Sequence, residues 1–91
     1  MNILATAFSA KSTGGTDAHE PMAWWIPYGE GKVFTTVLGH VGGGQPQKQW
    51  PMRCRGFQAM VTRACEWTAT GKVTIPLPAE LPSADAVSLA P

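Results

Sequence analysis

The sequence predicts a small α/β fold with an N-terminal strand, a β-hairpin, one long C-terminal helix and an extended tail. Two stretches rich in aromatic and β-branched residues, 23–28 and 33–38, flank a glycine-containing turn and are typical of paired strands. Apolar residues recur at three- and four-residue steps over 52–70, which indicates an amphipathic helix. The short apolar run at 3–8 precedes turn residues and is therefore expected to be a buried strand.

The hairpin is the element around which the rest of the chain is expected to pack. Residues 29–32 form its predicted turn, and four-residue loops are ordinary hairpin connections. Side chains alternate between the two faces of a strand, so Trp24 and Trp25 point to opposite faces. Both faces of the sheet then need cover, as in an α/β domain with helices on both sides.

The register of this hairpin brings ionisable residues together at its open end. With a four-residue turn, the numbers of cross-strand partners sum to about 61, so His40 falls opposite Glu20 or Pro21. His19 precedes Glu20 directly in the sequence. We therefore expect His19, Glu20 and His40 to meet.

Three interpretations of this group are open. Imidazole and carboxylate ligands suit a divalent metal such as zinc, with an open coordination position that polarises a carbonyl or activates water. Alternatively, His40 is a general base that Glu20 orients. In the third interpretation Glu20 is a surface residue and His40 is a hydrogen-bonded residue at a strand end. The candidate catalytic residues are thus His40 and Glu20, and the candidate metal ligands are His19, Glu20 and His40.

The predicted helix has boundary signals at both ends. Pro51 suits its first turn, and Gly71 suits its C-terminal stop. Cys54 and Cys65 lie about three turns apart along this helix, roughly 16 Å, whereas a disulfide needs about 4.4 to 6.8 Å between Cα atoms. We therefore expect no disulfide, and we interpret both cysteines as buried structural thiols rather than nucleophiles.

Composition and charge narrow the range of partners. The formal net charge is +1 and charged residues make up 14% of the chain, so we expect no nucleic-acid partner. Arg53, Arg55 and Arg63 are interpreted as a solvated face of the helix. Four Trp residues in a chain of 91 with so little charge indicate apolar surface that is covered by self-association or by a partner chain.

The sequence carries no signal for membrane insertion or export. No stretch approaches eighteen apolar residues, so no transmembrane helix and no membrane partner are predicted. The first ten residues lack a positively charged region, so no signal peptide is predicted and the cytoplasm is the default location.

Two motifs resemble those of a known family. The run PYGEGKVFTTVLGH (27–40) resembles a signature of the trehalose-utilisation (ThuA-like) family, and CRGFQAMVTRACEWTATGKVTIPLP (54–78) resembles the C-terminal helix and tail of its longer bacterial members. The resemblance implies a flavodoxin-like domain of the class I glutamine amidotransferase-like superfamily, connected with sugar metabolism. Because such a domain is much longer than this chain, it implies that residues 1–78 are the C-terminal part of one, and residues 79–91 are expected to be a poorly ordered tail.

The resemblance also bears on the predicted site. In related amidotransferases a triad histidine follows a sheet strand, as His40 does here, but Val41 and Gly42 replace the Pro-Glu that follows it there. Glutamine hydrolysis is therefore not predicted. Trp50, in the loop before the helix, is the candidate platform on which a sugar ring stacks. The function predicted is a partial ThuA-like domain in carbohydrate metabolism that is not catalytically competent by itself; the alternative is a non-catalytic interaction or oligomerisation module.

Overall fold

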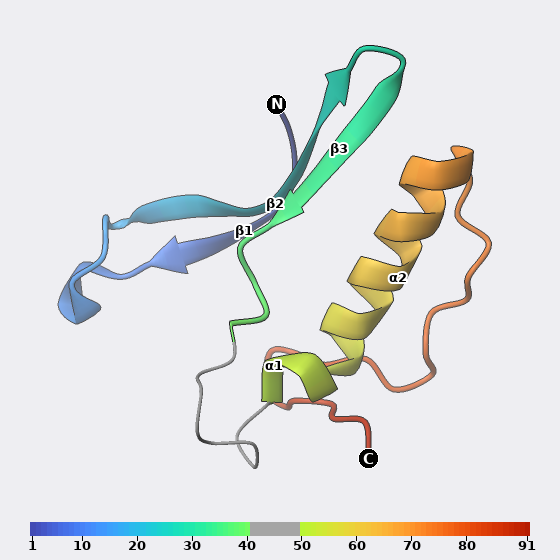
Figure 1. Cartoon of the computed structure of the whole chain (residues 1–91). Helices are drawn as coiled ribbons and strands as arrows, with labels where there is room; N and C mark the ends of the chain where they lie inside the picture. The colour runs from blue at the N-terminus through green and yellow to red at the C-terminus, as the bar shows by residue number, and fades with distance from the viewer. Residues whose placement is uncertain (41–49) are drawn as a thin grey trace. The chain divides into compact units, whose positions relative to one another are not determined.

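A computed structural model describes residues 1–40 and 50–91, with the backbone only of Trp50. The chain divides into two compact units, Met1–Leu38 and Gly39–Pro91, and each is described by itself. The elements in chain order are β1 (Asn2–Ser9), the 3₁₀ helix η1 (Lys11–Thr13), β2 (Ala18–Tyr28), β3 (Gly31–Thr36), α1 (Trp50–Arg53) and α2 (Arg55–Thr70) (Figure 1). The predicted α/β character is confirmed: a three-stranded antiparallel sheet precedes a C-terminal helix. The finer flavodoxin-like assignment stays a prediction.

The first unit is built on its central strand, β2. The strand order is β1-β2-β3: residues 18–25 of β2 pair with β1, residues 23–28 pair with β3, and the stretch 23–25 therefore has both neighbours. The register between β1 and β2 shifts on either side of Ala5, and Figure 1 shows β2 bending along its length. A bulge adds local twist and bends the strand that contains it. The strand pairing confirms the predicted N-terminal strand and the predicted hairpin.

The hairpin turn is shorter than predicted. Gly29 and Glu30 make a two-residue turn, because Tyr28 pairs directly with Gly31 and the numbers of paired residues sum to 59 instead of 61. Gly29 has a φ of 58°, and Glu30 has a negative φ. This is the pattern of a type II′ turn, which fits the twist of paired strands and favours glycine at its first position. The shift is even, so each side chain keeps the face that the sequence predicts.

β1 is a strand, as predicted, but the prediction that it is buried is wrong. Its large apolar side chains are exposed: Ile3 by 50%, Leu4 by 59% and Phe8 by 54%. β1 is an edge strand of the sheet, with a hydrogen-bonded neighbour on one side within the described residues. An apolar run predicts burial only where a second layer covers it, and no element of the first unit does so.

The predicted helix over 52–70 is two helices. Cys54 has extended backbone angles (φ −67°, ψ 120°) between α1 and α2, and it forms an isolated antiparallel bridge with Leu89. α2 ends as predicted at Gly71, whose φ is 77° and whose N–H donates to the carbonyl oxygen of Trp67 (2.7 Å). No helix in the described residues is long and apolar enough to cross a membrane.

Arg53 is exposed, as a solvated face requires, whereas Arg55 and Arg63 are half-buried, and all three also hold the C-terminal segment. Their donors contact the carbonyl oxygen of Ala90 (Arg53, 3.0 Å), the hydroxyl of Ser88 (Arg55, 3.0 Å) and the carbonyl oxygen of Ile75 (Arg63). Arg55 also forms a salt bridge with Glu80 at 3.1 Å. Residues 79–91, predicted to be a poorly ordered tail, thus return to the start of the helix, and Ser88 is buried there.

Glu66 makes a second connection between α2 and the segment after it. Its carboxylate accepts hydrogen bonds from the backbone N–H groups of Thr74 (2.6 Å) and Ile75 (3.0 Å) and from the Thr74 hydroxyl. The Thr74 hydroxyl first, then these two N–H groups and the charge of Arg63, lower the pKa of Glu66 below its ordinary value of 4.5. The ionised carboxylate therefore stabilises the fold of the second unit.

The two cysteines do not form a disulfide, as predicted. Cys54 is half-buried, but Cys65 is exposed, so the prediction that both thiols are buried is wrong for Cys65. Cys54 lies in the break between α1 and α2, outside the helical repeat that contains Cys65.

Gly39, the first residue of the second unit, lies against the side chain of Phe57. Its φ is 96°, and a Cβ added there would lie 2.5 Å from Cζ of Phe57 and 3.2 Å from Cε of Met52. Glycine is required at this position for both conformation and space.

We predict that Glu66→Gln lowers stability at neutral pH and that this deficit shrinks in acid. The folded-state pKa of Glu66 is depressed, so its contribution is fully present above pH 4.5 and is lost as the pH falls through the folded-state value. Urea unfolding of both proteins from pH 7 to pH 3 measures the deficit. Glu30→Gln, at the hairpin turn, is the matched control and should run parallel to the wild type. A deficit for Glu66→Gln that stays constant over this range would contradict the prediction.

We predict that Gly39→Ala destabilises the chain more than Gly71→Ala does. Both positions have positive φ, so each substitution costs about 1–2 kcal/mol of backbone strain. Only at Gly39 does the new methyl group collide with a ring, which adds about 1–3 kcal/mol. Chemical denaturation of the two variants measures the difference, and equal losses would show that Phe57 does not occupy this space.

Candidate functional site

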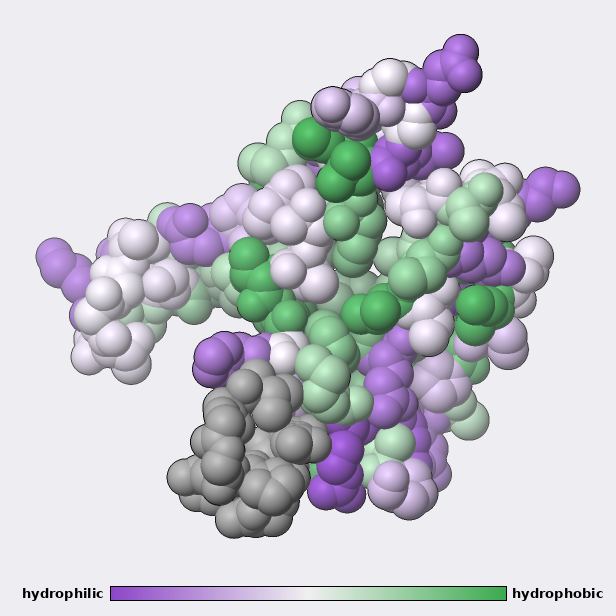
Figure 2. Space-filling model, in the orientation of Figure 1, coloured by the Kyte–Doolittle hydropathy of each residue, from purple (hydrophilic) through white to green (hydrophobic). Residues whose placement is uncertain are grey.

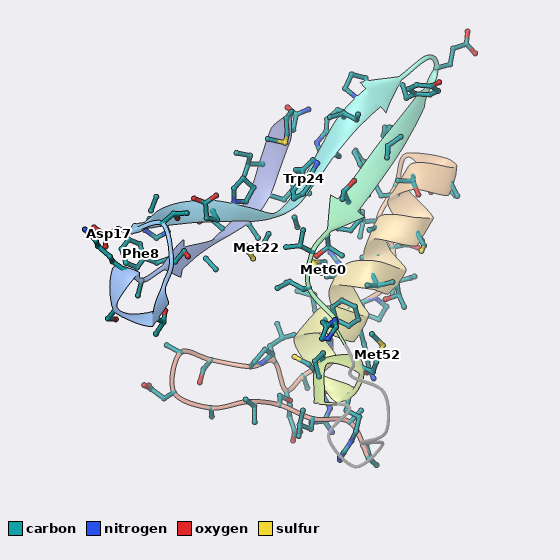
Figure 3. The ribbon with its side chains drawn as sticks, turned by 60° about the vertical axis from the view of Figure 1, so that its left-hand side comes forward. Phe8, Asp17, Met22, Trp24, Met52 and Met60 are labelled. Carbon is teal, nitrogen blue, oxygen red and sulfur yellow. The ribbon has the colours of Figure 1, made fainter. Side chains whose placement is uncertain are left out.

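His19 lies near the start of β2, opposite Phe8 of β1. The two rings are in edge-to-face contact, with centroids 5.3 Å apart and an interplanar angle of 64°. Figure 3 shows Phe8 and Asp17 at the end of the sheet where β1 leads into β2. His19 is exposed, so one side of its imidazole packs on an aromatic ring while the residue stays accessible to water.

Glu20 is half-buried, and a neighbouring loop residue holds its carboxylate. Oε1 of Glu20 accepts a hydrogen bond from the Thr16 hydroxyl (2.8 Å), and the Thr16 N–H donates to Oγ of Ser9 (3.2 Å). The N–H of Asp17, which has a φ of 61°, donates to the Ser9 carbonyl oxygen (2.6 Å). These contacts fix the loop and, through Thr16, the orientation of the carboxylate.

The strand geometry separates His19 from Glu20. Both residues belong to the regularly paired part of β2, where Glu20 pairs with Ala7 and His19 pairs with Phe8. Consecutive side chains of a strand point to opposite faces of the sheet. The two residues are therefore adjacent in sequence but do not converge on one face, which sequence proximity did not reveal.

His40 follows Gly39 at the start of the second unit and is exposed. The three predicted site residues are thus divided between the units, and a meeting of His40 with His19 or Glu20 stays a prediction. Within residues 1–40 and 50–91, no group of three or more His, Cys, Asp or Glu side chains is arranged to hold a metal ion. The side chain of Trp50 lies outside the described residues, so its role as a sugar platform also stays a prediction.

The second unit has an open groove that sequence reasoning missed. Its volume is about 330 Å³, and it lies between α2 and the extended segment after it, lined by Arg55, Gln58, Ala59, Thr62, Pro76, Leu77 and Pro78. The polar lining residues are engaged within the unit: Gln58 donates to the Met52 carbonyl oxygen (2.8 Å) and Thr62 to that of Gln58 (2.9 Å). The groove therefore offers an apolar wall rather than a set of catalytic groups. The alternation of Pro76 and Pro78 was the available signal for one wall, because it predicts that the segment after the helix is extended.

Comparison with known proteins gives one informative match. No family model matches the chain, and no curated protein matches it. The crystal structure of a protein from Parabacteroides merdae, described as ThuA-like, superposes on this chain with a TM-score of 0.88 and 39% sequence identity. The superposition covers 98% of this chain. This chain spans 32% of the length of that ThuA-like protein, to which it is similar in both sequence and structure.

Proposed function

We propose that this chain is one part of a ThuA-like domain that acts in carbohydrate metabolism of the trehalose type. The observation that supports it is the similarity to the Parabacteroides merdae protein, at 39% identity over nearly the whole of this chain. The class I glutamine amidotransferase-like superfamily and its flavodoxin-like sheet belong to the same proposal. Because this chain spans 32% of that protein, the proposed activity depends on residues supplied by the rest of a longer domain.

Within this proposal, His40 and Glu20 are the residues through which the chain contributes to a sugar site. Glu20 suits an orienting role, because the hydrogen bond from Thr16 holds its carboxylate in one position. His40 is exposed and is the candidate general base or metal ligand. Trp50 is the candidate surface on which a sugar ring stacks. Without further ligands or donors, such a group is incomplete, so no sugar turnover is expected from this chain by itself.

Zinc titration decides between the metal and the general-base versions of the site. If His19, Glu20 and His40 bind zinc, the wild-type chain shows modest affinity that weakens on acidification, because metal binding requires unprotonated ligands. His40→Ala should then weaken binding by about tenfold or more. Isothermal titration calorimetry measures both effects. Glu30→Gln is the control and should leave zinc binding unchanged, and isotherms for His40→Ala identical to the wild type would remove His40 as a ligand.

Sugar binding tests the proposed function in a complete domain. The joined protein consists of this chain in place of the matched third of the Parabacteroides merdae protein. We expect it to bind trehalose or a related glucoside and the isolated chain to bind neither. His40→Ala and Glu20→Gln should each weaken this binding by about tenfold or more, whereas Glu30→Gln should not. Calorimetric titration measures the affinities, and a folded joined protein without affinity for any such sugar would contradict the proposal.

A further inference from the structure

One face of the hairpin carries large apolar side chains that are exposed. Pairing places Ile26 opposite Val33 and Ile3 opposite Trp24, and directly paired residues lie on the same face of a sheet. With the two-residue alternation along each strand, the large apolar residues of this hairpin face are Ile3, Trp24, Ile26, Tyr28, Val33 and Val37. Figure 2 shows apolar residues, coloured green, at the molecular surface in the region of the hairpin.

The hairpin face differs from the opposite face of the same strands. Ile26 is 37% exposed, Val33 42% and Tyr28 77%, and the hairpin face contains no charged residue. The opposite face contains Ala23, which is 1% exposed, the half-buried pair Trp25 and Phe34, and the charged residue Lys32. A contiguous exposed apolar surface of this kind is typical of a protein–protein contact. It lacks the cations that nucleic acid needs.

The length of the similar ThuA-like protein bears on what covers the hairpin face. About two thirds of that protein lie outside its match to this chain, whereas the match takes in almost all of this chain. The edge strand β1 supports the same conclusion, because its sequence NILATAFS has no charge or proline to protect an open edge. Both features suit a surface that lies inside a larger fold.

We propose that the hairpin face is an internal contact surface of a longer ThuA-like fold. Its occupant is an apolar surface of the polypeptide that corresponds to the two thirds of the Parabacteroides merdae protein outside the match. This inference rests on the ThuA-like part of the proposed function, but it does not depend on a sugar or a metal. His40→Ala should therefore leave the contact unchanged.

The test compares Val33→Thr and Val87→Thr in the joined protein and in the isolated chain. Val33 is on the hairpin face, and Val87, in the C-terminal segment, is 80% exposed, so the same substitution is made inside and outside the proposed contact. In the joined protein Val33→Thr should lower the melting temperature by about 3 °C or more, because it places a hydroxyl in an apolar contact. In the isolated chain, where Val33 is 42% exposed, the shift should stay below about 1 °C. Val87→Thr should have no effect in either protein, and Ile26→Thr should add to the effect of Val33→Thr only in the joined protein.

Three outcomes would overturn the proposal. Equal shifts for Val33→Thr and Val87→Thr in the joined protein would show that the hairpin face is not covered there. A joined protein that stays insoluble, although its parent folds, would show that the hairpin face does not fit this partner. The third outcome is that the isolated chain forms a dimer in sedimentation experiments and that Val33→Thr dissociates it, while the melting temperature of the joined protein does not change with this substitution. The hairpin face would then be assigned to a second copy of this chain. If the joined protein shows the expected melting shifts but does not bind sugar, the result would contradict the proposed function and leave the proposed contact in place.

Discussion

The shortage of buried side chains constrains the rest of this structure. Within the described residues no large side chain is fully buried, and the buried residues are Ala23, Ala59 and Ser88. A chain of this size gains little from a hydrophobic core, because it buries a small fraction of its surface. The first unit therefore depends on the backbone hydrogen bonds of β2 to its two neighbours. Its large apolar residues stay exposed, because they could form a core only if a second layer packed against the sheet.

The second unit replaces a core with charged side chains that bind backbone. Arg53, Arg63 and Glu66 each hold a carbonyl or N–H group of the segment that follows α2. Hydrogen bonds with one charged partner are stronger than neutral ones, and an extended segment has backbone groups that need partners. The same contacts keep Pro76 and Pro78 beside α2, where they form one wall of the groove. Charge thus shapes the second unit even though the chain carries few charged residues.

Strand geometry alone predicts only part of the candidate site. The sequence predicts that His19, Glu20 and His40 belong together, and the structure supplies definite partners for two of them: the Phe8 ring for His19 and the Thr16 hydroxyl for Glu20. Neither partner is predictable from strand patterns, because Phe8 depends on the pairing of β1 with β2 and Thr16 on the conformation of the loop between them. Proton transfer or metal binding needs several groups at one point. In the proposed function, the further groups of the site therefore come from the rest of a longer domain.

The sequence by itself determined the features that depend on neighbouring residues. Alternating aromatic and β-branched residues specified the hairpin strands, and Gly71 specified the end of α2, because few other residues adopt its positive φ. Tertiary structure decided the rest. Cys54 interrupts the helix because its backbone pairs with Leu89, a residue far along the chain. The exposure of β1 likewise reflects the absence of a covering layer in the first unit, which no pattern within an apolar run can encode.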